Sequence, residues 1–259
     1  MHLLEETGED SWKSTPFTLN PGDLAAYGES MIPFSLDQLA PLMVNLPQFL
    51  AADPAVSAAF MGLMMATRNY TSGLVASADL DISRPLFVDV GGARGLDASS
   101  LLGCHPDLPS ETRVLVEDLP SVISDLPPRE TLDPRVQRIA HDFCTPQPDE
   151  GKGARAYFLH AVLHDWSDAD SLRIFAGIHA AMKPGYSKLL ICEVVLPPQG
   201  ATSRMTTMDL MMMSACSGLE RTEVDWRKLL GNAGFDVVKI WNRTGSFESV
   251  IEAALAGYA

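Results

Sequence analysis

The chain has 259 residues, 46% of them hydrophobic and 20% charged, a composition typical of a soluble globular protein that can bury its own core. Its formal net charge of −14 argues against nucleic acid and anionic membrane as partners, because both are bound by basic surfaces. The acidic start of the chain has no apolar signal segment, and the longest apolar runs are too short to span a bilayer. Its four cysteines form no CxxC pair, so we expect reduced thiols and a cytoplasmic location rather than disulfides or structural zinc.

The first 85 residues are predicted to form a helical segment. Proline and glycine interrupt stretches rich in Met, Ala and Leu that have helical spacing. The clearest helix begins at Asp53, a suitable N-cap that is followed by Pro54 at the first helical position. We expect residues 1–85 to contribute to a substrate pocket and to oligomerisation, and residues 86–259 to form a cofactor-binding domain.

From residue 86 onward, short apolar strands alternate with helices. We predict strands at 86–90, 113–117, 136–140, 156–160, 188–196, 235–241 and 248–255, and helices at 95–103, 120–126, 168–182, 202–217 and 223–233. Strands that are apolar throughout indicate an α/β fold with a Rossmann-like, doubly wound, mostly parallel seven-stranded sheet. The connection NRTGSF leaves no room for a crossover helix, so we expect the last strand to be antiparallel.

The stretch FVDVGGARG is predicted to be a strand, a glycine-rich turn and the start of a helix. In a doubly wound sheet the ligand crevice lies at the carboxyl ends of the strands, and Gly91, Gly92 and Gly95 let the backbone approach a ligand there. The spacing GGxxG differs from the dinucleotide fingerprint GxGxxG and favours a nucleoside ligand without a pyrophosphate. A tight strand-to-helix turn without any ligand is the alternative.

Polar side chains follow the next two strands. Asp118 ends the second strand, where its carboxylate can accept hydrogen bonds from ribose hydroxyls. Asp142 and Phe143 follow the third strand, and an acid beside an aromatic ring suits the amino group and the ring face of adenine. Solvated acids are the simpler interpretation, but features at the ends of three successive strands favour a nucleoside site.

Two histidines four residues apart stand in FLHAVLHDWSD. His160 ends the fourth strand and His164 follows it on the crevice side, while Ser167 is suited to cap the next helix. A strand end separates the two histidines, so they do not share a helical turn, and HExxH is absent. A metal site is therefore a lesser alternative to a general base at His164.

Two glutamates are candidate partners of His164. Glu193 stands in an otherwise apolar strand, where a carboxylate needs a partner. A second carboxylate, from Glu220, could fix the tautomer of a histidine that acts as a base. Alternatively, Glu220 and Arg221 form a solvated pair, and Thr222 caps the following helix.

Five methionines lie between residues 205 and 213. Such a stripe is most often part of a core, but methionine also lines adaptable pockets for flat aromatic ligands.

Together these segments resemble the S-adenosylmethionine-dependent O-methyltransferases of the caffeate and flavonoid type, especially their fungal relatives. The matching segments occur in family order over roughly residues 86–255: FVDVGGARG, VLVEDLPSVI, AHDFCTPQP, ARAYFLHAVLHDWSD, AAMKPGYSKLLICEVVLP, MDLMMMSACSGLERTEVDWRKLLGNAGFDVVKIW and VIEAALA. HDWSD combined with the later EVVLP and ERTE is a specific set.

The resemblance implies a role for each matching position. His164 would take the proton of a substrate hydroxyl, Glu193 and Glu220 would orient it, and no metal would be required. The expected cofactor residues are Asp89, Gly91, Gly92, Gly95, Asp118, Leu119, Asp142, Phe143 and His160. The expected substrate residues are Asp165, Trp166, Met208 and Met212.

The chain departs from the family pattern at three points. Ala93 replaces the middle glycine of the usual DVGGGxG turn and adds a methyl group near the cofactor. His160 replaces a lysine that is common in plant members. The resemblance begins only at LLEETGEDSWKSTPF, so we expect the family's N-terminal winged-helix domain to be missing and a homodimer to be weakened.

Three functions are consistent with this sequence. The first is O-methylation of a phenolic secondary metabolite. The second keeps the cofactor but catalyses a non-methylating reaction, such as a dehydration or a pericyclic step. The third is a partial subunit that needs a partner chain to complete its pocket.

Overall fold

The computed structural model describes residues 4–8, 11–14, 80–125, 132–242 and 248–258. Its chain contacts define two compact units. The first contains an antiparallel hairpin of β1 (Leu4–Gly8) and β2 (Ser11–Ser14), which the sequence did not predict. The helix predicted from Asp53 onward lies outside the described residues, and the domain boundary at residue 85 stays a prediction.

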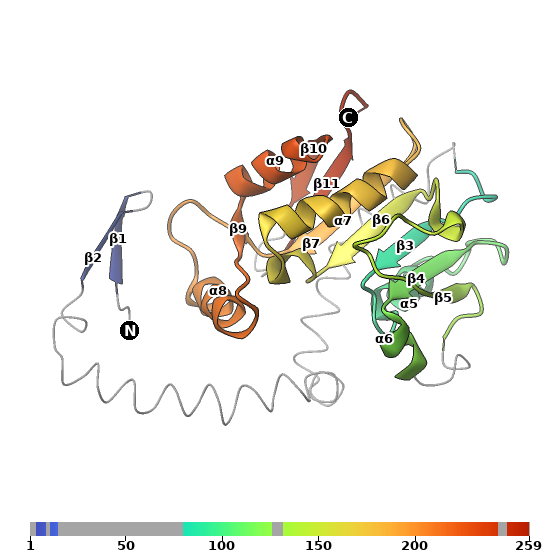
Figure 1. Ribbon diagram of the computed structural model, residues 1–259, viewed down its shortest axis with the longest axis horizontal. Helices are drawn as coiled ribbons and strands as arrows, with labels where there is room; N and C mark the ends of the chain where they lie inside the picture. Colours follow the sequence, from blue (N-terminus) through green and yellow to red (C-terminus); the bar gives the residue numbers. More distant parts are fainter. Residues whose placement is uncertain (1–3, 9–10, 15–79, 126–131, 243–247, 259) are drawn as a thin grey trace. The chain divides into compact units, whose positions relative to one another are not determined.

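The second unit is built on a seven-stranded sheet (Figure 1). In spatial order its strands are β10 (Phe235–Trp241), β11 (Ser249–Leu255), β7 (Lys188–Glu193), β6 (Ala156–His160), β3 (Phe87–Val90), β4 (Val114–Asp118) and β5 (Val136–Ala140). The strands from β7 to β5 pair parallel, whereas β11 pairs antiparallel with both β10 and β7. The predicted sheet, including its antiparallel last strand, is confirmed.

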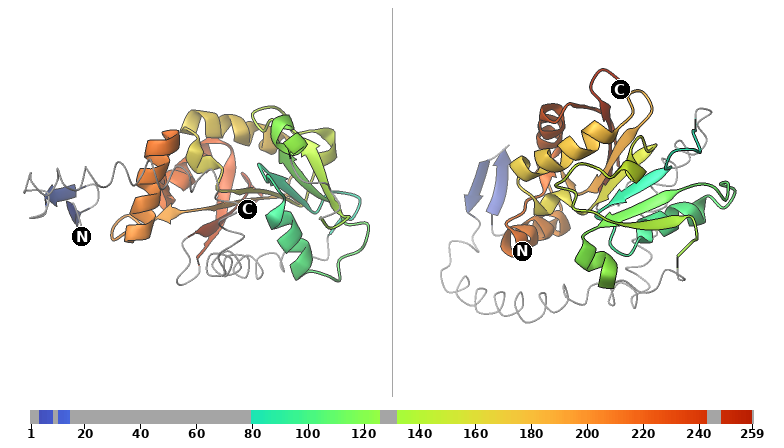
Figure 2. Two further views of the ribbon diagram at one scale, coloured as in Figure 1. Left: turned by 90° about the horizontal axis from the view of Figure 1, so that it is seen from below. Right: turned by 45° about the vertical axis from the view of Figure 1, so that its right-hand side comes forward.

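Helices cover both faces of this sheet (Figure 2). On one face, α7 (Asp168–Ala181) and α9 (Glu223–Asn232) pack through residues such as Phe175 and Trp226. On the other face, α5 (Leu96–Cys104) packs through residues such as Leu101. Because apolar cores lie on both faces, the central strands are apolar throughout rather than alternating.

The remaining helices are α6 (Pro120–Asp125), which contacts β5, and α8 (Ser203–Cys216). The caps predicted at Ser167 and Thr222 are confirmed, since their side chains accept the N–H groups of Asp170 and Asp225. The helix positions predicted from residue 86 onward agree with the structure to within one or two residues.

The predicted strand at 188–196 is wrong in one respect. The strand β7 ends at Glu193, and the chain continues as β8 (Val195–Leu196), which pairs parallel with β9 (Arg221–Thr222) in a separate two-stranded sheet. The apolar run hides this break because the residues on both sides of it favour strands.

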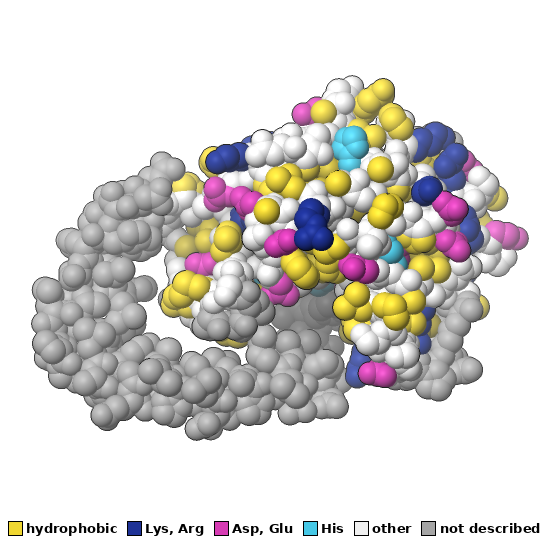
Figure 3. Space-filling view, viewed as in Figure 1, with side chains coloured by type: hydrophobic (Ala, Val, Ile, Leu, Met, Phe, Trp, Pro, Cys, Tyr) yellow, Lys and Arg dark blue, Asp and Glu magenta, His cyan; other side chains and the backbone are white. Residues whose placement is uncertain are grey.

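On the face shown in Figure 3, Lys and Arg side chains are interspersed with Asp and Glu side chains. Among the described residues, the helices are too short or too polar to cross a membrane.

Candidate active site

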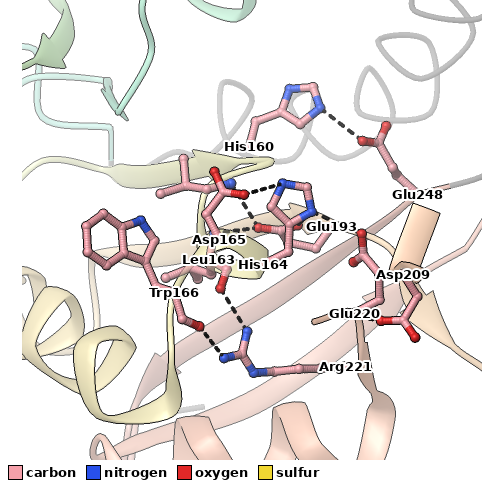
Figure 4. A network of polar contacts seen from close by, with 11 residues as sticks. His160, Leu163, His164, Asp165, Trp166, Glu193, Asp209, Glu220, Arg221 and Glu248 are labelled. Carbon is pink, nitrogen blue, oxygen red and sulfur yellow. Dashed lines mark hydrogen bonds and ion pairs between the residues drawn. The ribbon is translucent and has the colours of Figure 1, made fainter. Parts of the chain in front are cut away.

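His164 lies in a single 3₁₀ turn, η4 (Leu163–Asp165), just after β6 (Figure 4). Ala161 takes a left-handed conformation (φ 52°) between the strand and this turn. The Oε1 atom of Glu193 accepts the N–H groups of Val162 and Leu163, at 3.0 and 2.8 Å. The unexpected carboxylate of β7 therefore has a structural reason, because it satisfies N–H groups that a helical turn leaves unpaired.

Two buried glutamates face the imidazole of His164. Its Nδ1 atom lies 3.0 Å from Oε1 of Glu220 and 3.5 Å from Oε2 of Glu193. Its Nε2 atom lies 3.8 Å from a carboxylate oxygen of the exposed Asp165. The Nδ1–H group therefore donates to Glu220, and Nε2 is the nitrogen left for a ligand.

The parallel pair β8–β9 brings the two glutamates together. Val195 pairs with Arg221; Glu193 stands two residues before Val195 at the end of β7, and Glu220 directly precedes Arg221. Glu220 is only 5% exposed and Arg221 only 1%. The alternative of a solvated Glu220–Arg221 pair is therefore wrong, while Thr222 does cap α9.

Burial lowers the pKa of His164, but the hydrogen bond to Glu220 and the charges of Glu193, Glu220 and Asp165 together raise it to about 9. Burial raises the pKa of Glu193 to about 7, against the opposing effects of His164 and the main-chain N–H donors. The cluster thus makes the imidazole basic enough to accept a proton from a phenol, whose pKa is about 10.

Sequence reasoning missed three residues that support this turn. Arg221 donates hydrogen bonds to the main-chain oxygens of Leu163 and Trp166 and to the carboxylate of Asp168. Nothing in the sequence distinguishes this arginine from one on the surface.

The other two are Gly218 and Asp209. A Cβ atom on Gly218 would lie 2.1 Å from the main-chain oxygen of His164, and the next N–H group, of Leu219, donates to that same oxygen at 3.0 Å. Asp209 of α8 accepts the N–H group of Glu220 at 2.8 Å. Gly218 could have been recognised in the sequence, because it stands directly before LERTE, the segment that contains Glu220.

The glycine turn follows β3, as predicted. Gly91 and Gly95 have positive φ angles of 75° and 76°, and the N–H groups of Gly91 and Gly92 donate to the main-chain oxygen of Glu117. A Cβ atom on Gly91 would lie 3.1 Å from Val162, so glycine allows the turn to approach the start of the histidine loop.

Asp118 lies beside this turn at the end of β4. Its Oδ2 atom accepts the N–H group of Ala93 at 2.9 Å, and its Oδ1 atom accepts that of Leu119 at 2.8 Å. Ala93 has a φ angle of 44°, so alanine adopts the left-handed conformation here. Because a carboxylate has about four acceptor sites, Asp118 can still accept two hydroxyl groups.

Phe143, which follows β5, packs against the histidine turn. Its ring meets Trp166 edge-on, with ring centres 5.7 Å apart at 88°. The neighbouring Asp142 is exposed and accepts the N–H group of Cys144.

Of the predicted cofactor residues, Asp89 is buried, and His160 contacts two carboxylates of its own. Asp89 is 1% exposed and packs beneath Gly92, and burial raises its pKa well above the usual range. His160 has its own carboxylate partners, Asp97 and Glu248, and does not share those of His164. Of the two predicted methionines on α8, Met212 is buried and Met208 is half-buried.

A doubly wound sheet with an acid at the end of β4 and a histidine held by two glutamates is typical of an enzyme that binds a nucleoside-containing cofactor. A family model described as an O-methyltransferase domain matches residues 44–236. The O-methyltransferase mfmE of Annulohypoxylon moriforme is 34% identical over 98% of this chain and 70% of its own length. Some other fungal O-methyltransferases are matched over 45% of their length.

Solved structures agree with this match. The complex of LepI with SAM has a TM-score of 0.65 at 26% identity and covers 98% of this chain and 73% of its own. A protein described as a pericyclic reaction enzyme has a TM-score of 0.62 at 25% identity, with the same coverage. The chain belongs to the S-adenosylmethionine-dependent O-methyltransferase family, and its cofactor is S-adenosylmethionine.

Proposed function

We propose that this chain methylates a phenolic hydroxyl of a small aromatic secondary metabolite, with His164 as the general base. The observation that carries the proposal is the 3.0 Å contact between Nδ1 of His164 and Glu220. This contact selects the tautomer in which Nε2 carries a lone pair.

The residues at the carboxyl ends of β3, β4 and β5 suit the nucleoside part of the cofactor. Asp118 keeps acceptor sites for two ribose hydroxyls, and Phe143 and Asp142 suit the ring and the amino group of adenine. Leu119, which directly follows Asp118 and is 44% exposed, offers the adenine ring an apolar surface. The proposed cofactor residues are Asp89, Gly91, Gly92, Gly95, Asp118, Leu119, Asp142, Phe143 and His160.

When bound, S-adenosylmethionine supplies a methyl group on a sulfonium sulfur, which a phenolate oxygen can attack directly. His164 takes the phenolic proton on Nε2, and the oxygen keeps the electron pair that it needs as a nucleophile. Glu193 and Glu220 stabilise the imidazolium that results. The proposed substrate residues are Asp165, Trp166, Met208 and Met212.

Replacing the base tests the proposal. His164→Gln should lower methyl transfer to a panel of phenols by about 10²–10⁴-fold, the usual contribution of a general base. Binding of S-adenosylhomocysteine, measured by calorimetry, should stay within threefold. His179→Gln changes an exposed histidine of α7 and serves as the matched control. Unchanged turnover in His164→Gln would refute the proposal.

A second function is favoured by the similarity to the pericyclic reaction enzyme. The same base and cofactor would then serve a reaction in which no methyl group moves. Measuring S-adenosylhomocysteine against product distinguishes the two functions, because methyl transfer forms one molecule of it per product and the alternative forms none.

We include a homodimer and a cytoplasmic location in the proposal. The three cysteines Cys104, Cys144 and Cys192 are free thiols in the described part of the chain, as a reducing compartment would require. Light scattering with and without the cofactor measures the oligomeric state.

A further inference from the structure

A second cluster of potential metal ligands lies at the carboxyl end of the sheet. His160 ends β6 and pairs in register with Cys192 of β7, and Glu248 directly precedes β11. One ligand atom from each of these three residues lies within 4.8 Å of the other two. The sheet therefore brings together a nitrogen donor from β6, a sulfur donor from β7 and an oxygen donor from the residue before β11.

The distance between His160 and Glu248 fits two ligands of one ion better than a hydrogen bond. The Nε2 atom of His160 lies 3.4 Å from Oε1 of Glu248, and the two groups point toward each other (Figure 4). A hydrogen bond between such charged groups is about 2.7–2.9 Å long. Two ligands about 2.0–2.1 Å from a tetrahedral zinc ion lie roughly 3.3–3.4 Å apart.

Asp97 supplies the outer contact that histidine ligands of metals usually have. Its Oδ2 atom lies 2.9 Å from Nδ1 of His160, in the first turn of α5. If Nδ1–H donates to Asp97, the lone pair of Nε2 is directed toward the other two donors. This contact fixes both the tautomer and the orientation of the ring.

The charge and softness of the donors select the kind of ion. The carboxylates of Asp97 and Glu248 are 14% and 21% exposed and both face the imidazole of His160, and carboxylates attract a divalent cation. A thiol together with an imidazole is a donor set that zinc prefers over magnesium or calcium. Zinc binds the thiolate form of a cysteine, so binding at Cys192 releases the thiol proton.

We propose that His160, Cys192 and Glu248 bind one zinc ion, with Asp97 as the hydrogen-bond partner of His160 and the fourth position open to water or to a group of the cofactor, which His160 then contacts through the ion. The ion joins the ends of β6, β7 and β11 and stabilises the fold. The sequence argued against structural zinc because it has no CxxC pair. Ligands that are distant from one another in the chain, such as His160, Cys192 and Glu248, form no such motif.

The test uses the full chain without a histidine tag, loaded with zinc and freed of excess metal. Mass spectrometry of the metal should find one zinc per chain in the wild type and less than a tenth of that in Cys192→Ser. The cobalt-loaded wild type should show a thiolate-to-cobalt absorption band, which Cys192→Ser loses. Cys144→Ser, the matched control at a partly exposed cysteine, should keep both signals.

Two further variants test the site if Cys192→Ser does not fold. Asp97→Asn should weaken zinc binding by about 10–100-fold. His164→Gln should leave it unchanged, which separates this site from the donors His164, Glu193 and Glu220. A wild-type chain without the cobalt band, or zinc lost from His164→Gln but kept in Asp97→Asn, overturns the proposal. Methyl transfer is measured separately, so its absence does not affect this result.

Discussion

The guanidinium of Arg221 donates a hydrogen bond of 2.9 Å to the main-chain oxygen of Leu163, the residue before His164. A second bond, of 2.8 Å, reaches the main-chain oxygen of Trp166 on the other side of the turn. The arginine side chain is 1% exposed and also stacks against Trp226. The position of the proposed base is therefore set through the main chain by a buried cation.

Arg221→Lys should lower turnover by about ten- to a hundredfold, because an ammonium group cannot hold both carbonyls in the geometry of the guanidinium fork. The lost hydrogen bond should lower the free energy of unfolding by about 1.5–3 kcal/mol. Steady-state kinetics and urea unfolding measure the two effects. Arg227→Lys, at an exposed arginine of α9, is the control. Wild-type kinetics in Arg221→Lys would contradict this assignment.

Glu220→Gln should shift the pH dependence of kcat/KM toward lower pH. His164 must be neutral to accept a proton, so activity should fall tenfold per pH unit below its pKa of about 9. The substitution removes the charge of Glu220 and weakens its hydrogen bond to Nδ1, both of which raise the pKa of His164, so this pKa falls toward the usual value of about 6.5. Glu223→Gln on α9 should leave the profile unchanged. An acidic limb that does not move in Glu220→Gln would exclude His164 as the titrating group.

The strands and helices could be predicted from the sequence more completely than the contacts between residues. From residue 86 onward the central strands are apolar throughout, and the helices have helical apolar spacing with clear caps at Ser167 and Thr222, so both kinds of element can be recognised from local sequence. Glu193 could be recognised because a carboxylate in an apolar strand requires a partner, although its partners, the N–H groups of Val162 and Leu163, are visible only in the structure.

The support of the histidine turn could not be predicted in the same way. Arg221 and Gly218 contact main-chain oxygens of residues more than fifty positions away in the chain. Every residue has such an oxygen, so the residue type at the accepting position does not reveal the contact. The β8–β9 pairing was missed for a related reason, since a register between two-residue strands depends on the loops around them.

Asp118→Asn should weaken the binding of S-adenosylhomocysteine by about 10–100-fold, the loss expected for a charged hydrogen bond of about 1.5–3 kcal/mol. The amide can still accept the N–H group of Ala93, so the glycine turn should remain folded. Calorimetric titration measures the affinity. Asp149→Asn, an exposed acid beside Lys152, should bind as the wild type does. Equal affinities in the two variants would remove Asp118 from the ribose site.

Gly218→Ala should disturb the base without touching its side chain. The added methyl carbon would lie 2.1 Å from the main-chain oxygen of His164, so the histidine turn must shift. We expect a loss of about 1–3 kcal/mol in the free energy of unfolding from overpacking, and a lower kcat at nearly unchanged cofactor affinity. Gly231→Ala in α9 is the control, because no described heavy atom lies within 4 Å of its Cβ position, and alanine there should add about 0.5–1 kcal/mol. Unfolding curves and single-turnover rates measure both variants, and a Gly218→Ala enzyme with full kcat would show that the turn tolerates the shift.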